Sequence, residues 1–266
     1  MPNAPAPQSP VTGVRVALEQ REGGTIARVT IDNVAKLNTL GSALMLEFVD
    51  AIAALGRRDD LRAVVLTGAG EKAFIGGASI PEMAALDDTT ARAFITLVHE
   101  TCDCLRRLPV PVIARIDGYA LGAGLEVAVS CDLRIATARA KFGMPEVRVG
   151  LPSVVEAALI PSLIGFGRAR ELMMLGETID AATALDWGLV ERVVAPEALD
   201  DEIDKVLAAL LAAGPLAIRQ QKALMQAWER LPPDGAIAAG VDAFERTFAA
   251  DEARRLLSGF FARKRR

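Results

Sequence analysis

The chain has 266 residues, of which 52% are hydrophobic and 24% are charged, and its net charge is -4 with a pI near 5.3. This apolar content can build a sizeable core. The acidic balance, with one dense basic run at residues 263–266, gives no electrostatic footprint for nucleic acid. No stretch has the roughly 18 uninterrupted apolar residues of a membrane span, since even residues 110–129 contain Arg115, Asp117 and Glu126. We therefore expect neither a nucleic-acid nor a membrane partner.

The rarer residue types narrow the classes further. The first ten residues contain four prolines and neither lysine nor arginine, so we interpret residues 1–13 as a disordered tail rather than a targeting peptide. Three cysteines without a C-x-x-C pair favour buried thiols in a reducing, cytoplasmic compartment. His99 is the only histidine, which excludes two-histidine zinc sites, and no G-x-S-x-G elbow for a serine nucleophile is present. We predict no metal site.

Between Thr25 and Leu189, short β-branched runs alternate with amphipathic segments, a pattern typical of an α/β fold. The periodicity predicts strands over residues 25–32, 63–67, 112–116 and 133–137, and helices over residues 42–55, 89–108 and 124–129. We assign residues 14–195 to this α/β core.

After Val194 the pattern becomes helical throughout. The sequence predicts helices over residues 199–213, 215–230, 236–250 and 251–261. An all-helical stretch of this kind cannot bury every apolar face on itself. We expect residues 196–266 to pack on the core, on a neighbouring subunit, or on both.

A first glycine-containing corner spans residues 71–82, just past a predicted buried strand. Its two adjacent glycines let the backbone turn sharply and approach a ligand closely. The S-x-x-E spacing of Ser79 and Glu82 indicates a capping box. It predicts a helix that begins near Ile80, with free N–H groups facing Ala78, and such an end can bind an anion. An ordinary strand–turn–helix corner explains this segment equally well.

A second corner, over residues 116–132, places Ala123 between two glycines where a loop becomes a helix. Glu126 lies in the first turn of this helix, in surroundings that are almost wholly apolar, so its carboxylate needs a function or a partner. A capping glutamate on a buried helix is the alternative. Glu146 follows in a loop punctuated by glycine and proline. Two corners with exposed amides and two carboxylates in apolar settings form a constellation typical of an active site.

These segments together resemble the crotonase superfamily, the enoyl-CoA hydratase/isomerase family. The motif A-F-x-x-G-A that ends at Ala78 is similar to the family's first oxyanion loop, and G-Y-A-L-G-A-G-x-E, ending at Glu126, is similar to the second. The motif F-G-x-P-E resembles the loop of the second carboxylate, Glu146. The run T-I-D-A-x-x-A-x-x-x-G-L-V from Thr178 is similar to the family's approach to its helical trimerisation region. The resemblance covers roughly residues 14–260.

The resemblance implies a core of repeated ββα units, a C-terminal helical trimerisation region, and a homotrimer or dimer of trimers. It implies that the N–H groups of Ala78 and Ala123 bind the thioester oxygen of an acyl-CoA, with Ser79 and Ile80 as further substrate-binding residues. No separate cofactor is implied, because coenzyme A is part of the substrate.

The resemblance further implies an enoyl-CoA hydratase in which Glu126 activates a water and Glu146 protonates Cα. A glutamic acid can donate a proton near neutral pH only if an apolar site raises its pKa. Isomerases, thioester hydrolases and C–C bond lyases share the oxyanion hole and remain alternatives, although isomerisation needs only one base. A non-catalytic acyl-CoA-binding oligomer is the alternative outside enzymes.

The sequence departs from the family after Glu146. Relatives commonly have G-x-G-G-T-Q-R-L where residues 152–160 here read P-S-V-V-E-A-A-L-I. The spacing of Ser153 and Glu156 predicts a second capping box, which makes Glu156 structural. The alternative is a third carboxylate reaching into the acyl pocket. We hypothesise that this segment narrows or re-aims that pocket.

Overall fold

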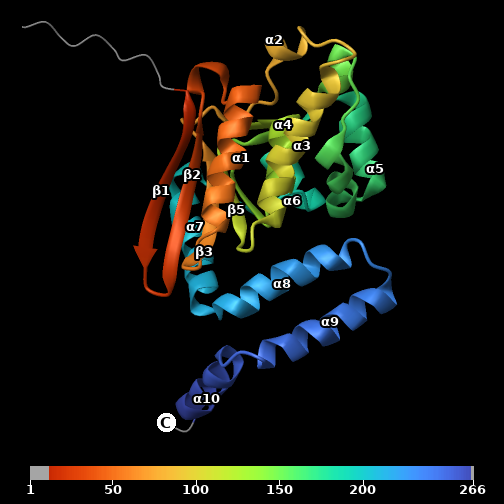
Figure 1. The fold of residues 1–266 in the computed structure, drawn as a ribbon. Coiled ribbons are helices and arrows are strands. Elements are labelled where there is room, and N and C mark those ends of the chain that lie inside the picture. Colours follow the sequence, from red (N-terminus) through yellow and green to blue (C-terminus); the bar gives the residue numbers. More distant parts are fainter. Residues whose placement is uncertain (1–11, 265–266) are drawn as a thin grey trace, which may run out of the picture.

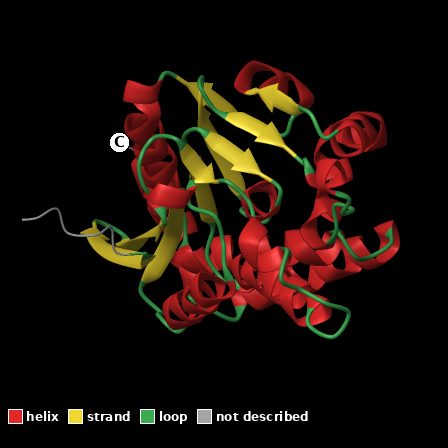
Figure 2. Cartoon of the chain, turned by 90° about the horizontal axis from the view of Figure 1, so that it is seen from above, coloured by secondary structure: helices red, strands yellow, loops and turns green. Residues whose placement is uncertain are grey.

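The computed structural model describes residues 12–264 and is a mixed α/β fold with two sheets (Figures 1 and 2). The larger sheet has the spatial order β1 (Gly13–Arg21), β2 (Gly24–Asp32), β3 (Leu61–Gly68), β5 (Val112–Ile116), β7 (Leu133–Thr137) and β10 (Arg192–Val194). Strand β1 is antiparallel to β2, and the other neighbours are parallel. The smaller sheet consists of β4 (Ala73–Ile75), β6 (Tyr119–Leu121), β8 (Lys141–Gly143) and β9 (Thr178–Asp180).

Helices surround these sheets. The α-helices are α1 (Ser42–Gly56), α2 (Ile80–Met83), α3 (Ala91–Arg107), α4 (Ala123–Val129), α5 (Ile160–Leu175), α6 (Ala181–Trp187), α7 (Leu199–Ala212), α8 (Pro215–Trp228), α9 (Pro233–Phe248) and α10 (Glu252–Lys264). Short 3-10 helices are η1 (Val34–Lys36), η2 (Glu146–Val149), η3 (Val155–Leu159) and η4 (Pro196–Ala198). Among the helices of residues 12–264, none combines the length and the hydropathy that a membrane crossing requires.

The central strand β3 is covered on both faces, because successive side chains of a strand point to opposite sides. Val64 and Leu66 belong to the main core, to which α1 and α3 also contribute. Ala63 and Val65 pack in a second core with the apolar side of α7. A parallel strand buried on both faces reads as a continuous apolar run, which is why the sequence predicts it so clearly.

The predicted elements of the α/β core and the four C-terminal helices are confirmed to within a few residues. Strands β1, β4, β6, β8, β9 and β10 were not predicted. The tail was expected over residues 1–13, but Gly13 already belongs to β1, and residues 1–11 lie outside the described residues. In the C-terminal region, α7 packs on the sheet. Helices α9 and α10 lie apart from it (Figure 1). Helix α8 is tied to the core by the buried Lys222, whose Nζ donates to the Leu105 and Val110 carbonyls and to Asp132.

Strand β4 is enclosed by three glycines from neighbouring elements. A Cβ placed on Gly68, Gly118 or Gly124 would lie 1.9, 2.1 or 2.0 Å, respectively, from a carbonyl oxygen of residues 72–75. Such distances are far inside van der Waals contact, so no other residue type fits there without moving the backbone. These three glycines therefore fix the path of β4 relative to β3, β6 and α4.

Gly124→Ala tests this constraint without introducing backbone strain, because Gly124 lies in helix α4, where alanine is favoured over glycine. We expect it to lower the free energy of unfolding by about 1–3 kcal/mol or more, measured by chemical denaturation, since overpacking forces the backbone apart. Gly167→Ala, in helix α5, is the matched control because a Cβ there meets nothing within 4 Å. It should be neutral or stabilising by up to about 1 kcal/mol. Equal effects of the two substitutions would contradict the packing argument.

Candidate active site

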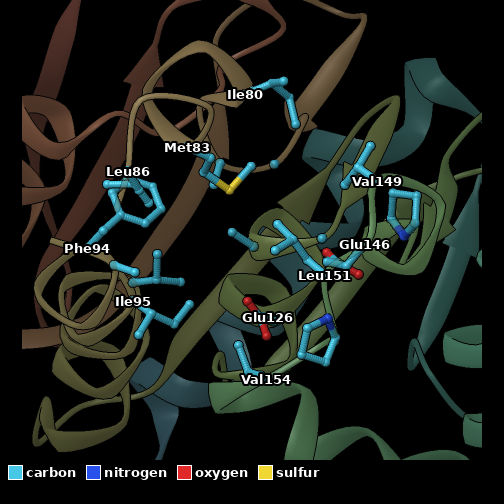
Figure 3. A pocket seen from close by; sticks show the side chains of 18 of the residues that line it. Ile80, Met83, Leu86, Phe94, Ile95, Glu126, Glu146, Val149, Leu151 and Val154 are labelled. Atoms are coloured by element: carbon cyan, nitrogen blue, oxygen red, sulfur yellow. The ribbon is translucent and has the colours of Figure 1, made fainter. Parts of the chain in front are cut away.

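A cavity of about 990 Å³ lies between the α2–α3 region, the start of α4 and residues 145–154 (Figure 3). Most of its wall is apolar, with side chains of Ile80, Met83, Leu86, Phe94, Ile95, Val98, Leu121, Val149, Leu151 and Val154. Two carboxylates, Glu126 and Glu146, lie among these groups. An apolar pocket with a few converging polar groups is the usual form of a small-molecule site.

The first corner presents the amide of Ala78 to this cavity. Leu40 N–H donates to the Gly77 carbonyl, and Ser79 N–H donates to the Leu40 carbonyl, in an isolated parallel bridge. Gly77 has a φ of 119°, a conformation that side chains rarely adopt. The sharp turn leaves Ala78 between these two hydrogen bonds, as a residue of the cavity wall.

The predicted capping box at this corner forms only in part. The Ser79 hydroxyl accepts a 3.4 Å hydrogen bond from Glu82 N–H at the start of α2. The Glu82 carboxylate does not return to Ser79 but accepts from Ser42 N–H at 3.0 Å, at the start of α1. The Glu82 carboxylate lies beside the start of α1 and bonds there. The Ser79 N–H, which a full capping box would use, already donates to the Leu40 carbonyl.

The second corner presents Ala123, the first residue of α4, after Gly122 with a φ of 52°. The N–H at the first position of a helix has no partner within the helix. Within residues 12–264, neither Ala78 nor Ala123 donates a backbone hydrogen bond, and both residues line the cavity. Because β4 and β6 run parallel as neighbours, the corners that follow them meet at the same edge. Both residues therefore lie at the same end of the smaller sheet.

Glu126 is 4% exposed and projects from α4 into the cavity (Figure 3). Its Oε1 accepts a 3.2 Å hydrogen bond from Ala157 N–H. Burial, and after it the nearby Glu146 carboxylate, raises the pKa of Glu126 to about 8, although the Ala157 amide opposes this shift. Glu126 therefore carries a proton at neutral pH.

Glu146 begins η2, and its carboxylate lies beside that of Glu126 in the cavity (Figure 3). The Ser153 hydroxyl donates to its Oε2 at 2.8 Å. Its Oε1 lies where a side chain of Gly122 would be, because a Cβ there would be 2.4 Å from this oxygen. The absence of a side chain at Gly122 thus permits both the turn before Ala123 and the position of the Glu146 carboxylate. Sequence reasoning missed Ser153, because its spacing to Glu156 suggested a helix cap.

The second predicted capping box, at Ser153 and Glu156, is wrong. The N-cap of η3 is Val154, and it makes no side-chain cap. The Ser153 hydroxyl donates to Glu146 instead, and the Glu156 carboxylate bonds to His99 of α3. Glu156 is not among the residues that line the cavity, whereas Pro152 and Val154 of the same segment are.

The structure brings most of the predicted site residues together. Those that line one cavity are Ala78, Ile80, Ala123, Glu126 and Glu146. Ser79 is not among the lining residues, and its hydroxyl caps α2 instead.

The family model for enoyl-CoA hydratase/isomerase matches residues 21–266. The chain therefore belongs to the enoyl-CoA hydratase/isomerase family, the crotonase superfamily. It is 34% identical over 251 residues to a crotonyl-CoA hydratase of Syntrophomonas wolfei, covering 94% of this chain and 96% of the relative. It is 34% identical to a short-chain-enoyl-CoA hydratase of Clostridium acetobutylicum, with 91% and 93% covered. An enoyl-CoA hydratase structure from Bacillus anthracis superposes with a TM-score of 0.89 at 29% identity, covering 94% of this chain and 96% of the other. These comparisons confirm the predicted family and fold class.

The raised pKa of Glu126 predicts a pH-dependent stability. Between the ordinary pKa of 4.5 and the folded value of about 8, the folded protein holds a proton that the unfolded chain has released. Stability should therefore fall as pH rises through this window. Glu126→Gln removes this contribution, so on going from pH 4.5 to above pH 8 the stability of the variant should rise relative to that of the wild type by up to roughly 5 kcal/mol. Denaturant titrations across this range measure the difference, and parallel curves for the two proteins would refute the assigned protonation.

Proposed function

We propose that this protein is an enoyl-CoA hydratase, which adds water in syn fashion across the α,β double bond of a 2-enoyl-CoA thioester through an oxyanion-stabilised enolate. The observation that carries the proposal is the convergence of two unbonded amides and two carboxylates on one apolar cavity. The hydratase names of the relatives support the same activity.

In this mechanism the thioester oxygen accepts hydrogen bonds from Ala78 and Ala123 N–H. Addition of water at Cβ shifts electrons toward this oxygen and makes an enolate, so the two amides bind the transition state more strongly than the substrate. Each preorganised donor of this kind typically contributes about 3 kcal/mol. The surrounding apolar wall excludes water and strengthens both hydrogen bonds.

Hydration also requires one protonated and one ionised carboxylate. Glu126 activates the water and Glu146 delivers a proton to Cα in the roles that we propose. Burial favours the protonated form of Glu126, which supplies this proton in the proposed mechanism. A water bonded to both carboxylates can relay it to Glu146 without changing the total charge. Glu126 then takes a proton from the water as its oxygen attacks Cβ, and Glu146 protonates Cα, which restores the starting charge distribution.

The test measures the absorbance of the conjugated enoyl-thioester, which hydration removes. The substrates are 2-enoyl-CoA thioesters of increasing chain length. Glu126→Gln and Glu146→Gln should each lower kcat by about 10²–10⁴-fold, the usual effect of losing a positioned acid or base. Glu100→Gln, exposed on α3, is the matched control and should retain wild-type activity. Full activity in both site variants would sink the mechanism. Deuterium exchange at Cα without addition of water would favour an isomerase, and binding without turnover would favour the acyl-CoA-binding oligomer.

The reaction proposed here needs no separate cofactor. The thioester activates the double bond, and the chain supplies the acid, the base and the oxyanion donors from its own residues. We also propose a cytoplasmic location, which the buried free thiols of Cys102, Cys104 and Cys131 support.

We further propose a homotrimer or a dimer of trimers built on the C-terminal helices. The support is an exposed apolar row on α9, where Ile237, Val241 and Phe244 are 67%, 65% and 68% exposed. Their spacing places them on one face of the helix. Helix α9 lies away from the sheet (Figure 1), so a neighbouring subunit is a suitable cover for this face.

Phe244→Glu places a charge in this row and should shift the sedimentation coefficient toward that of smaller species, because a buried unpaired charge opposes association. Ala238→Glu adds the same charge to the same helix about 100° away from the row and is the control. A wild-type protein that sediments as a monomer would contradict the proposed assembly.

A further inference from the structure

Glu126 depends on a short turn outside its own helix. Within the described residues, its carboxylate receives one hydrogen bond, from Ala157 N–H at 3.2 Å. The same N–H also points to the Val154 carbonyl at 2.9 Å. The direction of the Glu126 carboxylate therefore follows the placement of residues 154–157.

This turn is not held by its own local structure. Val154 precedes η3 without a side-chain cap. Val155 has a φ of 40°, a left-handed conformation that is an outlier for a β-branched residue. Such a conformation persists only where the surrounding structure holds it in place. The turn must be anchored from elsewhere.

Ala157 is buried in the main core and Val155 packs against it, and the polar anchor of the turn is the contact between Glu156 and His99. Glu156 lies between the strained Val155 and Ala157, and its side chain is 7% exposed. Its Oε1 lies 2.7 Å from Nδ1 of His99 on α3, the only histidine of the chain. Its Oε2 is buried without a hydrogen-bond partner. A single contact thus holds a buried carboxylate to the neighbouring helix.

Burying a carboxylate with a single hydrogen-bond partner lowers the free energy of unfolding, so we expect this arrangement to have a role beyond packing. Burial raises the pKa of Glu156 and the His99 contact lowers it, with smaller effects of Asp103 and Arg106 from α3. Glu156 also acts on Glu126 of α4, as one of the groups that raise its pKa. The contact joins this buried carboxylate to an imidazole that is 49% exposed. An apolar residue in place of a buried carboxylate of this kind often gives equal or greater stability.

We propose that His99 and Glu156 are positioning residues that hold the Val154–Ala157 turn, so that the Ala157 amide fixes the Glu126 carboxylate in the cavity. The proposal rests on the hydratase function proposed above. Neither residue lines the cavity, so both act through Glu126 rather than on the substrate.

The first experiment separates turnover from binding. His99→Phe and Glu156→Ala break the contact and should lower kcat on crotonyl-CoA by about tenfold or more, because small misplacements of a catalytic group are costly. KM should change much less. His99→Gln and Glu156→Gln keep a hydrogen-bonding pair and should recover most of this loss. Glu100→Ala on α3 is the control. Wild-type kcat in the two disruptive variants would overturn the proposal, as would a full return of kcat in the apolar pair His99→Phe with Glu156→Met.

The pH profile gives a readout that simple stabilisation would not move. Glu156→Gln removes one of the charges that raise the pKa of Glu126 and keeps the turn, so the limb of kcat that reports Glu126 should shift to lower pH. An unchanged profile would count against the proposal.

A second experiment does not depend on turnover. A double-mutant cycle of Glu126→Gln and Glu156→Ala, followed by chemical denaturation, should give a coupling energy different from zero. Additive effects would overturn the proposed link. Coupling in a protein that hydrates none of the enoyl-CoA substrates would reject the hydratase function and leave the structural link between Glu156 and Glu126 intact.

Discussion

The close passage of β4 between three glycines is the contact on which the rest of the site depends. Gly68, Gly118 and Gly124 leave no space for a side chain, so the backbone of β4 lies directly against β3, β6 and α4. The corners after β4 and β6 then carry Ala78 and Ala123 to the same edge. Oxyanion donors work only when they lie within a few tenths of an ångström of the ideal hydrogen-bond position relative to their acceptor. Close backbone packing in the core therefore sets the geometry of the amides at the cavity.

The two carboxylates are accommodated by opposite means. Glu126 is enclosed, holds a proton and receives one amide hydrogen bond. Glu146 lies over Gly122 and is bonded by the Ser153 hydroxyl. Burial favours the protonated form of Glu126, and two acids in different surroundings can divide the roles of acid and base between them. The apolar wall that makes this possible also makes the site unfavourable for folding once Glu126 ionises.

The sequence predicts much of the fold because its signals are local and repeated. Apolar runs identify β3 and β5, and glycine-bracketed corners identify the starts of α2 and α4, whereas the short strands β4 and β6 were not predicted. It fails where a residue had a choice of partners. The S-x-x-E spacing occurs twice, yet Glu82 bonds to Ser42 and Glu156 to His99, residues far away in the chain. Tertiary neighbours decide between such partners, and spacing alone carries no information about them. Strand β1 was missed although Val14, Val16 and Leu18 alternate along it, and Val16 and Leu18 are 42% and 48% exposed, so this alternation does not mark a core face.

The oxyanion donors of the proposed mechanism are main-chain amides, which bears on how such a site can diverge. A substitution at Ala78 or Ala123 changes the shape of the wall but leaves the N–H in place, and only proline removes it. The acid and base, by contrast, are side chains that a single replacement can delete or move. The scaffold thus separates a durable element, which stabilises the enolate, from replaceable ones, which decide where protons and water go. A lineage can exchange one reaction for another at the carboxylates while retaining the ability to activate a thioester.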